Sequence, residues 1–174
     1  MNLCELYNQA YYKNKYGMLL NMDCVEAMKM IDDNSIDLTV TSPPYDNLRT
    51  YNGYCFDFEN TAKELYRITK DGGVVVWIVN DATIKGSETG TSFKQALYFK
   101  EIGFNLHDTM IYEKNGTGAC GSNNCYWQTF EYMFVFTKGK IKTVHRLDNW
   151  KPRTKGGIKT GRITKDGVQK VEID

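Results

Sequence analysis

The chain has 174 residues, 41% of them hydrophobic and 25% charged, which is enough for one globular domain with a real core. No apolar stretch approaches the about 18 to 20 residues that span a bilayer, and the N-terminus lacks a signal-peptide pattern, so we expect no membrane partner. The net charge of +1 excludes a strongly acidic or basic chain, although residues 138–174 hold 11 Lys and Arg against 4 acidic residues and residues 1–137 hold 11 against 17.

The first half of the chain alternates apolar runs with helical periodicity, which predicts parallel β-α units. In chain order we expect a short apolar run over 18–20, a helix after Asp23, a strand over 36–41, a polar Tyr-rich loop over 47–60 and a helix over about 61–70. Asp23 can cap the first helix, in which apolar residues recur at three-residue steps. Gly72 and Gly73 are expected to end the second helix.

The second half continues the pattern with a run that is apolar without alternation. In chain order we expect a strand over 74–79, a Gly/Ser/Thr loop over 82–90, a helix capped by Thr91 or Ser92 and ended by Gly103, a strand pair over 105–112 and 130–137, and an intervening loop over 115–124. A strand without alternation is typical of the centre of a parallel sheet, so both faces of 74–79 should be buried. Asn80 and Asp81 follow it as either polar groups of a site or ordinary loop residues.

The cysteines indicate reduced thiols. Five are present, Cys4, Cys24, Cys55, Cys120 and Cys125; they form no CxxC pair and are odd in number, which favours the cytoplasm over a disulfide framework. The spacing of His107 from the last two fits no common zinc pattern, so we predict no metal site.

Two prolines end the first predicted strand, in the stretch Thr41-Ser42-Pro43-Pro44-Tyr45. Each proline lacks an N–H and fixes φ at about −65°, so the strand must stop at Ser42 in a rigid turn. Ligands of open α/β sheets bind just outside the carboxyl ends of strands. A stiff turn with a hydroxyl, free carbonyls and an aromatic ring is therefore expected to hold a flat ligand; the alternative is an ordinary strand-terminating loop.

The C-terminal part is a candidate arm for an anionic partner. Glycines alternate with Lys and Arg over residues 151–170, a pattern that favours contact with a phosphate backbone over a packed core. The candidate phosphate contacts are Arg153, Lys155, Lys159 and Arg162. A solvated tail that is basic for solubility is the alternative.

Four motifs occur in order: Asp23-Cys24, residues 35–45, residues 72–77 and residues 131–139. Together they resemble the amino-methylating DNA methyltransferases (the cytosine-N4 and adenine-N6 family), in the permuted group whose catalytic motif precedes the cofactor motif. The resemblance covers about residues 17–140 and implies an α/β, Rossmann-like methyltransferase sheet. It implies that residues 1–140 are the catalytic part of a methyltransferase domain and residues 141–174 the basic start of a target-recognition region.

One expected motif is missing from the chain. In that group a glycine-rich turn of the type Phe-x-Gly-x-Gly binds S-adenosylmethionine and lies after the target-recognition region. The glycine cluster after residue 140 is basic and follows no buried strand. We therefore expect a truncated form with the catalytic half of the sheet only, which binds the cofactor weakly or not at all. A half-sheet exposes an edge and apolar surface, which favours a homo-oligomer or a complementing chain.

The resemblance also implies roles for the turn. The Ser42 hydroxyl and the Pro43 carbonyl, held in place by Pro44, would accept the amino hydrogens of the target base and so localise its nitrogen lone pair. Tyr45 would stack on that base, a contact worth about 1–3 kcal/mol. The base must be flipped out of double-stranded DNA to reach the turn, and S-adenosylmethionine would be the methyl donor of the complete enzyme.

Several alternatives stay open. A serine before Pro-Pro-Tyr favours cytosine-N4 over adenine-N6 in this family, whereas Asp23 either caps its helix, which we favour, or lies near the cofactor. Arg49 and Tyr51 either contact DNA or belong to a solvated loop. A non-catalytic DNA-binding or assembly module that needs a second chain is the rival function, and methylation of RNA or of a protein side chain is a third.

Overall fold

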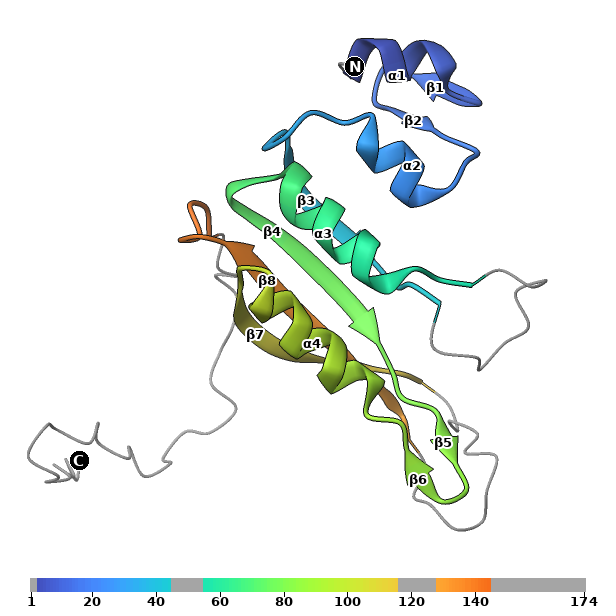
Figure 1. Cartoon of the computed structure of the whole chain (residues 1–174), viewed down its shortest axis with the longest axis vertical. Helices are drawn as coiled ribbons and strands as arrows, with labels where there is room; N and C mark the ends of the chain where they lie inside the picture. The colour runs from blue at the N-terminus through green and yellow to red at the C-terminus, as the bar shows by residue number, and fades with distance from the viewer. Residues whose placement is uncertain (1–2, 45–54, 116–127, 145–174) are drawn as a thin grey trace, which may run out of the picture. The chain divides into compact units, whose positions relative to one another are not determined.

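The computed structural model describes residues 3–44, 55–115 and 128–144. The chain divides into a unit of residues 1–143 and a unit of residues 144–174, and the fold is that of the first unit (Figure 1). Its elements are α1 (Leu3–Gln9), β1 (Tyr12–Asn14), β2 (Gly17–Leu19), α2 (Cys24–Lys29), β3 (Ile36–Thr41), α3 (Phe58–Ile68), β4 (Thr69–Val79), β5 (Thr83–Ile84), β6 (Ser87–Glu88), α4 (Thr91–Glu101), β7 (Phe104–Glu113) and β8 (Phe130–Lys138).

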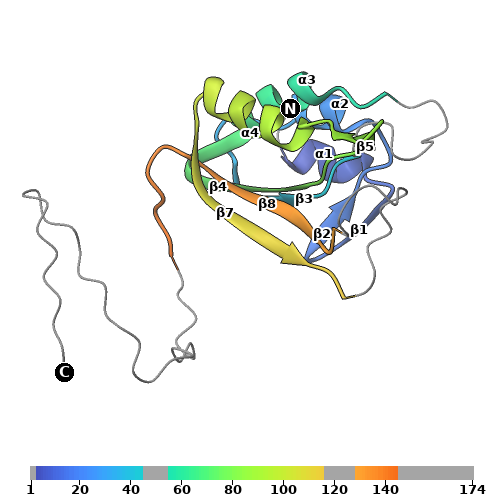
Figure 2. The ribbon, with the colours of Figure 1, turned by 90° about the horizontal axis from the view of Figure 1, so that it is seen from below.

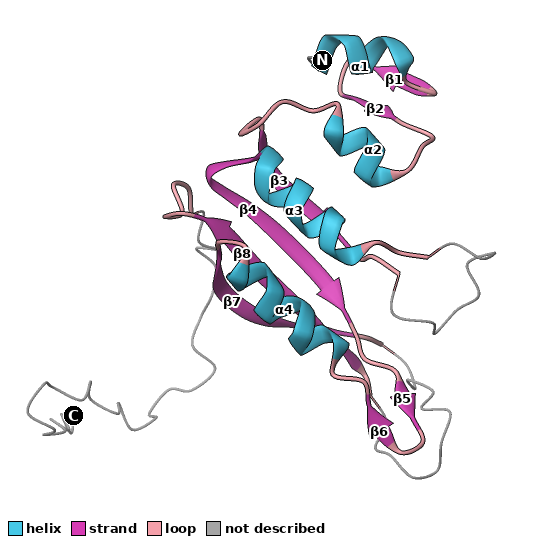
Figure 3. Cartoon of the chain, viewed as in Figure 1, coloured by secondary structure: helices cyan, strands magenta, loops and turns pink. Residues whose placement is uncertain are grey.

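The main sheet has four strands in the order β3-β4-β8-β7 (Figure 3, magenta). β3 and β4 are parallel and joined through α3, as the β-α pattern predicted. β8 runs antiparallel to both β4 and β7, so the predicted strand pair over 105–112 and 130–137 is confirmed. In the parallel pair Thr41 lies opposite Trp77, which places the end of β3 beside the carboxyl-terminal part of β4.

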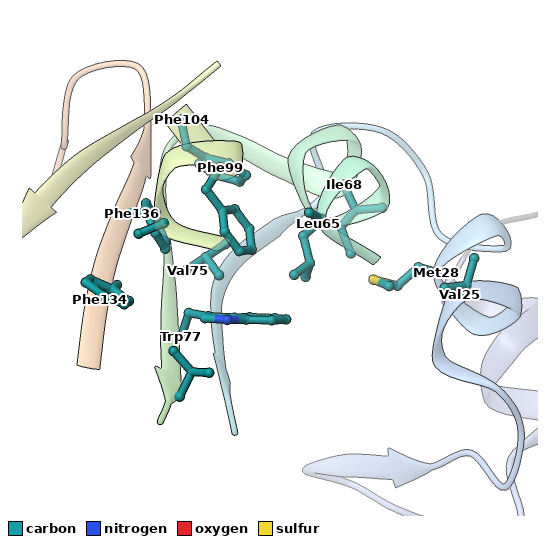
Figure 4. Packing of buried hydrophobic residues seen from close by; sticks show 13 residues of the cluster. Val25, Met28, Leu65, Ile68, Val75, Trp77, Phe99, Phe104, Phe134 and Phe136 are labelled. Atoms are coloured by element: carbon teal, nitrogen blue, oxygen red, sulfur yellow. The ribbon is translucent and has the colours of Figure 1, made fainter. Parts of the chain in front are cut away.

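One face of the sheet carries the hydrophobic core. α3 and α4 lie together on this face, as Figure 2 shows from below. Figure 4 shows the core side chains between these helices and the strands, with Trp77, Phe99 and Phe136 fully buried. The rings of Phe99 and Phe136 stack with centroids 4.5 Å apart, so α4 is fastened to β8 by aromatic contact.

The other face of the sheet is open within the described residues. Val74, Val76 and Ile78 of the central strand β4 are only half-buried there, and Leu38 and Val40 of β3 are 57% and 60% exposed. The prediction that both faces of residues 74–79 are buried is therefore wrong for the described fold. Both long helices lie on the core face, opposite to the open one. The apolar side chains on the open face therefore have no covering layer in this part of the chain.

The boundaries of the second helix differ from the prediction. α3 begins at Phe58, because the Asp57 side chain accepts a hydrogen bond from the backbone N–H of Asn60. It ends at Ile68, and the next residue, Thr69, already pairs with β3. Gly72 and Gly73 therefore lie inside β4 instead of ending the helix.

Candidate functional site

The Pro-Pro turn lies at the carboxyl end of β3, where the sequence placed it. The strand ends at Thr41, and the three following residues have no regular secondary structure, which confirms the predicted stop at Ser42. Ser42 is exposed, Pro43 is buried and Pro44 is half-buried. An exposed serine thus stands next to a proline that packing holds in place.

A pocket of about 300 Å³ opens beside this turn. It is lined by residues of α2, β3, α3 and β4 and of the segments that flank them: Cys24, Met28, Thr39, Thr41, Ser42, Pro43, Pro44, Phe56, Thr61, Leu65 and Trp77. Most of these side chains are apolar, and the hydroxyls come from β3, from Ser42 just after it and from the start of α3. The pocket is therefore small and mostly apolar, with a row of hydroxyl groups along β3.

The Trp77 indole forms a wall of the pocket. Figure 4 shows it extending from β4 to beneath Leu65 of α3. Its Nε1–H donates a hydrogen bond of 2.8 Å to Oε1 of Gln95, a residue of α4 that is itself buried. The ring of Phe56 stacks on it at 6.3 Å between centroids with 30° between the planes. Stacking by Phe56 and the hydrogen bond to Gln95 thus fix the orientation of the Trp77 ring.

Arg67 holds the elements on either side of the pocket together. Its guanidinium donates to the carbonyl oxygens of Met28 at 2.7 Å and Ile31 at 2.9 Å, and it pairs with Glu64 and Asp33. The hydrogen bond to Glu64 raises the pKa of Arg67 above its ordinary value in spite of partial burial, so the charge is retained. The end of α2 is thereby tied to α3, which sets the width of the pocket between them.

Asp23 caps α2, as the sequence favoured. Its Oδ1 accepts hydrogen bonds from the backbone N–H groups of Val25 at 2.9 Å and Glu26 at 3.2 Å. A second role for Asp23 near a cofactor stays a prediction. The adjacent Cys24 is a free, exposed thiol.

Asp81, at the carboxyl end of β4, has a structural role. It is only 6% exposed and accepts hydrogen bonds from the backbone N–H of Ser92 at 2.9 Å and from the Ser92 hydroxyl. Thr91 and Ser92 do not cap α4 themselves: the N-cap is Gly90, with φ of 65° and no side-chain hydrogen bond. The predicted cap is wrong because the Asp81 carboxylate, two residues after the end of β4, accepts the hydrogen bonds at the start of the helix instead.

A larger hollow of about 830 Å³ lies at the opposite, amino ends of β3 and β4. Asp37 and Lys70, which form a salt bridge of 2.7 Å, are among the residues that line it. Ligands of parallel sheets bind outside the carboxyl ends of strands. The smaller pocket beside the Pro-Pro turn is therefore the candidate site.

Other predicted residues lie outside the described part of the chain. These are Tyr45, Arg49, Tyr51, Cys120, Cys125, Arg153, Lys155, Lys159 and Arg162. Their roles stay predictions. Among the residues that the structure describes, no group of His, Cys, Asp or Glu side chains could hold a metal ion, and no helix is long and apolar enough to cross a membrane.

Sequence reasoning assigned no role to several pocket residues. Thr39, Phe56 and Trp77 meet at the pocket only because distant segments fold together, and the same packing brings Gln95 to the Trp77 indole. One local signal was present: Thr39 and Thr41 alternate with Leu38 and Val40, and such alternation places the hydroxyls on the face opposite the exposed apolar side chains.

Sequence comparisons place these motifs in a family. A DNA methylase family model matches residues 36–168. The orphan methyltransferase M.BamHII of Bacillus amyloliquefaciens is 65% identical over 129 residues, which cover 74% of this chain and 48% of that protein. The type II beta methyltransferase M.BslI of Bacillus sp. (strain NEB-606) is 29% identical over 167 residues, or 81% of this chain and 18% of that protein. The chain thus spans at most about half the length of these relatives.

Solved structures share the fold. The PvuII DNA methyltransferase (cytosine-N4-specific) superposes with a TM-score of 0.62 at 17% identity, over 76% of this chain and 53% of that one. A DNA modification methylase from Thermus thermophilus, TTHA0409, complexed with S-adenosyl-L-methionine, superposes with a TM-score of 0.56 at 20% identity, over 72% and 55%. These matches confirm the α/β methyltransferase sheet, and a family model that covers most of the chain, including the turn at the end of β3, shows that the chain belongs to the N6/N4 DNA methylase family.

Proposed function

We propose that the complete protein is an S-adenosylmethionine-dependent DNA methyltransferase that acts on the exocyclic amine of a flipped base, cytosine-N4 in preference to adenine-N6. The observation that carries the proposal is the Ser42-Pro43-Pro44 turn at the carboxyl end of β3, beside a pocket of about 300 Å³. Membership of the DNA methylase family supports DNA as the substrate. Ser42 and the likeness to a cytosine-N4-specific enzyme support the choice of base.

The turn suits the handling of an aromatic amine. The lone pair of such an amine is delocalised into the ring, so acceptors for its hydrogens are needed to localise the pair on nitrogen. The Ser42 hydroxyl is exposed and can accept one hydrogen, and the Pro43 carbonyl can accept the other. Burial of Pro43 fixes that carbonyl before the base arrives, which is electrostatic preorganisation.

The described residues fit the acceptor base better than the methyl donor. S-adenosylmethionine supplies a methyl group on a sulfonium when it is bound. The Asp23 carboxylate already accepts two backbone hydrogen bonds of α2, and no Phe-x-Gly-x-Gly sequence occurs in the chain. We therefore assign no step through the donor to these residues, and we expect the 174-residue chain by itself to bind S-adenosylmethionine weakly or not at all.

The test is incorporation of labelled methyl groups into double-stranded DNA by the complete protein. Ser42→Ala should lower the rate by about 100-fold, the typical effect of losing one preorganised polar contact in a transition state. Tyr45→Ala should also lower it, because a stacking contact is lost. Ser87→Ala, an exposed hydroxyl of the β5-β6 hairpin, is the matched control and should keep the full rate. Full activity in both site variants would contradict the proposed roles.

The basic residues of the C-terminal region are proposed as contacts to the phosphates of DNA. Arg153, Lys155, Lys159 and Arg162, with Arg49 and Tyr51 after the turn, are the candidates. Neutralising the four basic C-terminal residues together should weaken DNA binding and reduce its dependence on salt. An unchanged salt dependence would contradict these assignments.

A second candidate function is that of an assembly module, and the open face of the sheet favours it. Leu38 and Val40 of β3 with Met110 of β7 leave apolar surface uncovered within the described residues. Such surface favours a second copy or a complementing chain. Size-exclusion chromatography with light scattering discriminates the two candidates, because a clean monomer at high concentration would weaken the second.

A further inference from the structure

The N-terminal hairpin, residues 11–19 with strands β1 and β2, presents a group of exposed tyrosines. Tyr11, Tyr12 and Tyr16 are 76%, 59% and 85% exposed. Single exposed apolar residues are normal on a protein surface, but three large rings within six residues form a patch of the kind that marks an interaction surface. The hairpin precedes residues 36–168, which the family model matches, so that match assigns it no role.

Hydrogen bonds give the N-terminal hairpin an ordered shape. The side-chain oxygen of Asn14 accepts from the backbone N–H groups of Tyr16 at 2.8 Å and Gly17 at 3.0 Å, which closes the turn. The Tyr7 hydroxyl donates to the Asn14 carbonyl at 3.1 Å and so ties α1 to the hairpin, and Leu6 of the same helix is fully buried. The exposed rings therefore stand on an ordered support, so that little conformational entropy is lost when a partner binds.

The N-terminal hairpin is basic, although acidic residues outnumber basic ones in the chain before residue 138. Residues 6–22 contain Lys13 and Lys15 and no acidic residue. The Lys13 ammonium lies 4.8 Å from the centroid of the Tyr7 ring, and the Lys15 ammonium lies 4.6 Å from that of Tyr16. These cation–π contacts hold each ammonium beside a ring and leave its N–H groups available to an anion.

A phosphate backbone fits this combination of groups. Lysine ammonium groups and tyrosine hydroxyls both donate to phosphate oxygens. The hydroxyls of Tyr11, Tyr12 and Tyr16 make no hydrogen bond to the residues that the structure describes, so they are available for this contact. An apolar partner would bury the two ammonium groups without a counter-charge, which is costly. The chemistry of the patch thus favours a polyanion.

The N-terminal hairpin is also close in the chain to the candidate site. β2 ends at Leu19, and Cys24 lines the pocket beside the Pro-Pro turn. Five residues span at most about 18 Å when they are fully extended. One strand of B-DNA rises about 3.4 Å per nucleotide, so this length corresponds to about five base pairs. The hairpin can therefore contact DNA beside the target base without entering the pocket.

We propose that the N-terminal hairpin is a DNA-docking surface, at which Lys13, Lys15 and the exposed tyrosines bind the phosphate backbone of the duplex beside the target base. The proposal rests on the proposed function for the identity of the partner, and it adds a surface to that function. Contacts to phosphates position a duplex and carry no sequence information. The hairpin should therefore strengthen binding to every duplex by the same factor.

Fluorescence anisotropy of a labelled DNA duplex, titrated with the complete protein at several salt concentrations, tests the proposal. Lys13→Gln with Lys15→Gln should reduce the slope of log affinity against log salt by about 1.8, which is two phosphate contacts at about 0.9 each. The loss of affinity should be equal for duplexes of different sequence. Tyr16→Phe keeps the ring and removes the hydroxyl, so it should weaken binding about two- to tenfold.

Lys94→Gln with Lys100→Gln is the matched control. Both lysines are exposed on α4, and their replacement changes the net charge by the same amount, so the parental slope should be kept. Acetylation of lysines by an N-hydroxysuccinimide ester, followed by mass spectrometry, reads out contact directly in the parent protein. Duplex DNA should slow the acetylation of Lys13 and Lys15 several-fold and leave that of the α4 lysines unchanged. Far-UV circular dichroism checks that each variant is folded.

An unchanged salt slope in the hairpin variant, an equal fall in the α4 variant, or a lack of protection from acetylation would overturn the inference. A molar mass that falls in the hairpin variant alone, measured by light scattering without DNA, would also overturn it, because the patch would then be a protein interface. Parental DNA binding by the hairpin variant together with a loss of methylation in Ser42→Ala would overturn this inference and leave the proposed function standing. Protection of the hairpin by DNA without any methylation by the complete protein would do the reverse.

Discussion

The hydrogen bond between Trp77 and Gln95 should contribute to the stability of the domain more than any single surface contact. Both side chains are buried, and the Nε1–Oε1 distance is 2.8 Å. Gln95→Leu leaves the indole N–H without an acceptor inside the core, which costs about 1–3 kcal/mol. Trp77→Phe leaves the amide oxygen without a donor and also reduces core volume, for a cost of about 2–4 kcal/mol.

The two substitutions should not be additive. Each single variant leaves one buried polar group without its hydrogen-bond partner, and this raises its cost. The double variant removes both polar groups, so this cost is absent and the double variant loses less stability than the sum of the two single variants. We expect a coupling free energy of about 1–2 kcal/mol for residues in contact. Urea unfolding followed by far-UV circular dichroism measures all four proteins without relying on tryptophan emission.

A surface glutamine provides the control. Gln128 donates to Glu88 at 2.6 Å in an exposed pair, and its replacement by Leu should change the free energy of unfolding by no more than about 0.5 kcal/mol. If the costs of Trp77→Phe and Gln95→Leu add to within about 0.3 kcal/mol of the double variant, the buried bond does not hold the indole and the reasoning fails.

Three further predictions concern stability. Asp81→Ala leaves a buried amide and a buried hydroxyl at the start of α4 without an acceptor and should cost about 2–3 kcal/mol in urea unfolding. Burial, with the charges of Glu88 and Asp81, raises the pKa of Tyr132 above 10.0. The neutral phenol therefore contributes to the free energy of unfolding below pH 10, and this contribution is lost as the pH rises through the folded-state pKa. Tyr132→Phe should therefore lose stability less steeply above pH 10, and an equal slope would contradict this. Gly103→Ala should lower the melting temperature, because φ is +116° and a Cβ would lie 2.8 Å from a tyrosine hydroxyl.

Local signals in the sequence predicted the frame of the fold. The Asp23 cap, the strand over 36–41 and its stop before the prolines depend on neighbouring residues, so they could be read directly. The same holds for the end of α4 at Gly103, which has positive φ. These features need no knowledge of distant parts of the chain.

The parts that could not be predicted depend on contacts between distant segments. The start of α4 is capped by Asp81, eleven residues before Ser92, and no local sequence pattern predicts that contact. Arg67 reaches carbonyl groups of residues 28 and 31, which only the packing of α3 against α2 brings within range. The pocket is likewise formed by residues of four elements, so its lining could not be predicted from the sequence. The Pro-Pro turn at its edge could be predicted, because it is a local motif.

The open face and the candidate site meet on one strand. Leu38 and Val40 point to the uncovered face of β3, and Thr39 and Thr41 point into the pocket. A second copy that covers the outer side should stabilise β3 and the Pro-Pro turn at its end, because a partner that binds only the folded strand stabilises the folded state.

The free energy of unfolding should therefore rise with protein concentration if copies associate through this face. Val40→Lys places a charge on the open face without touching the pocket, so it should abolish the association and hold the free energy of unfolding at its dilute value. Light scattering on the same samples reports whether association occurs. Association that persists unchanged in Val40→Lys would show that copies meet through another surface, which would contradict the reasoning.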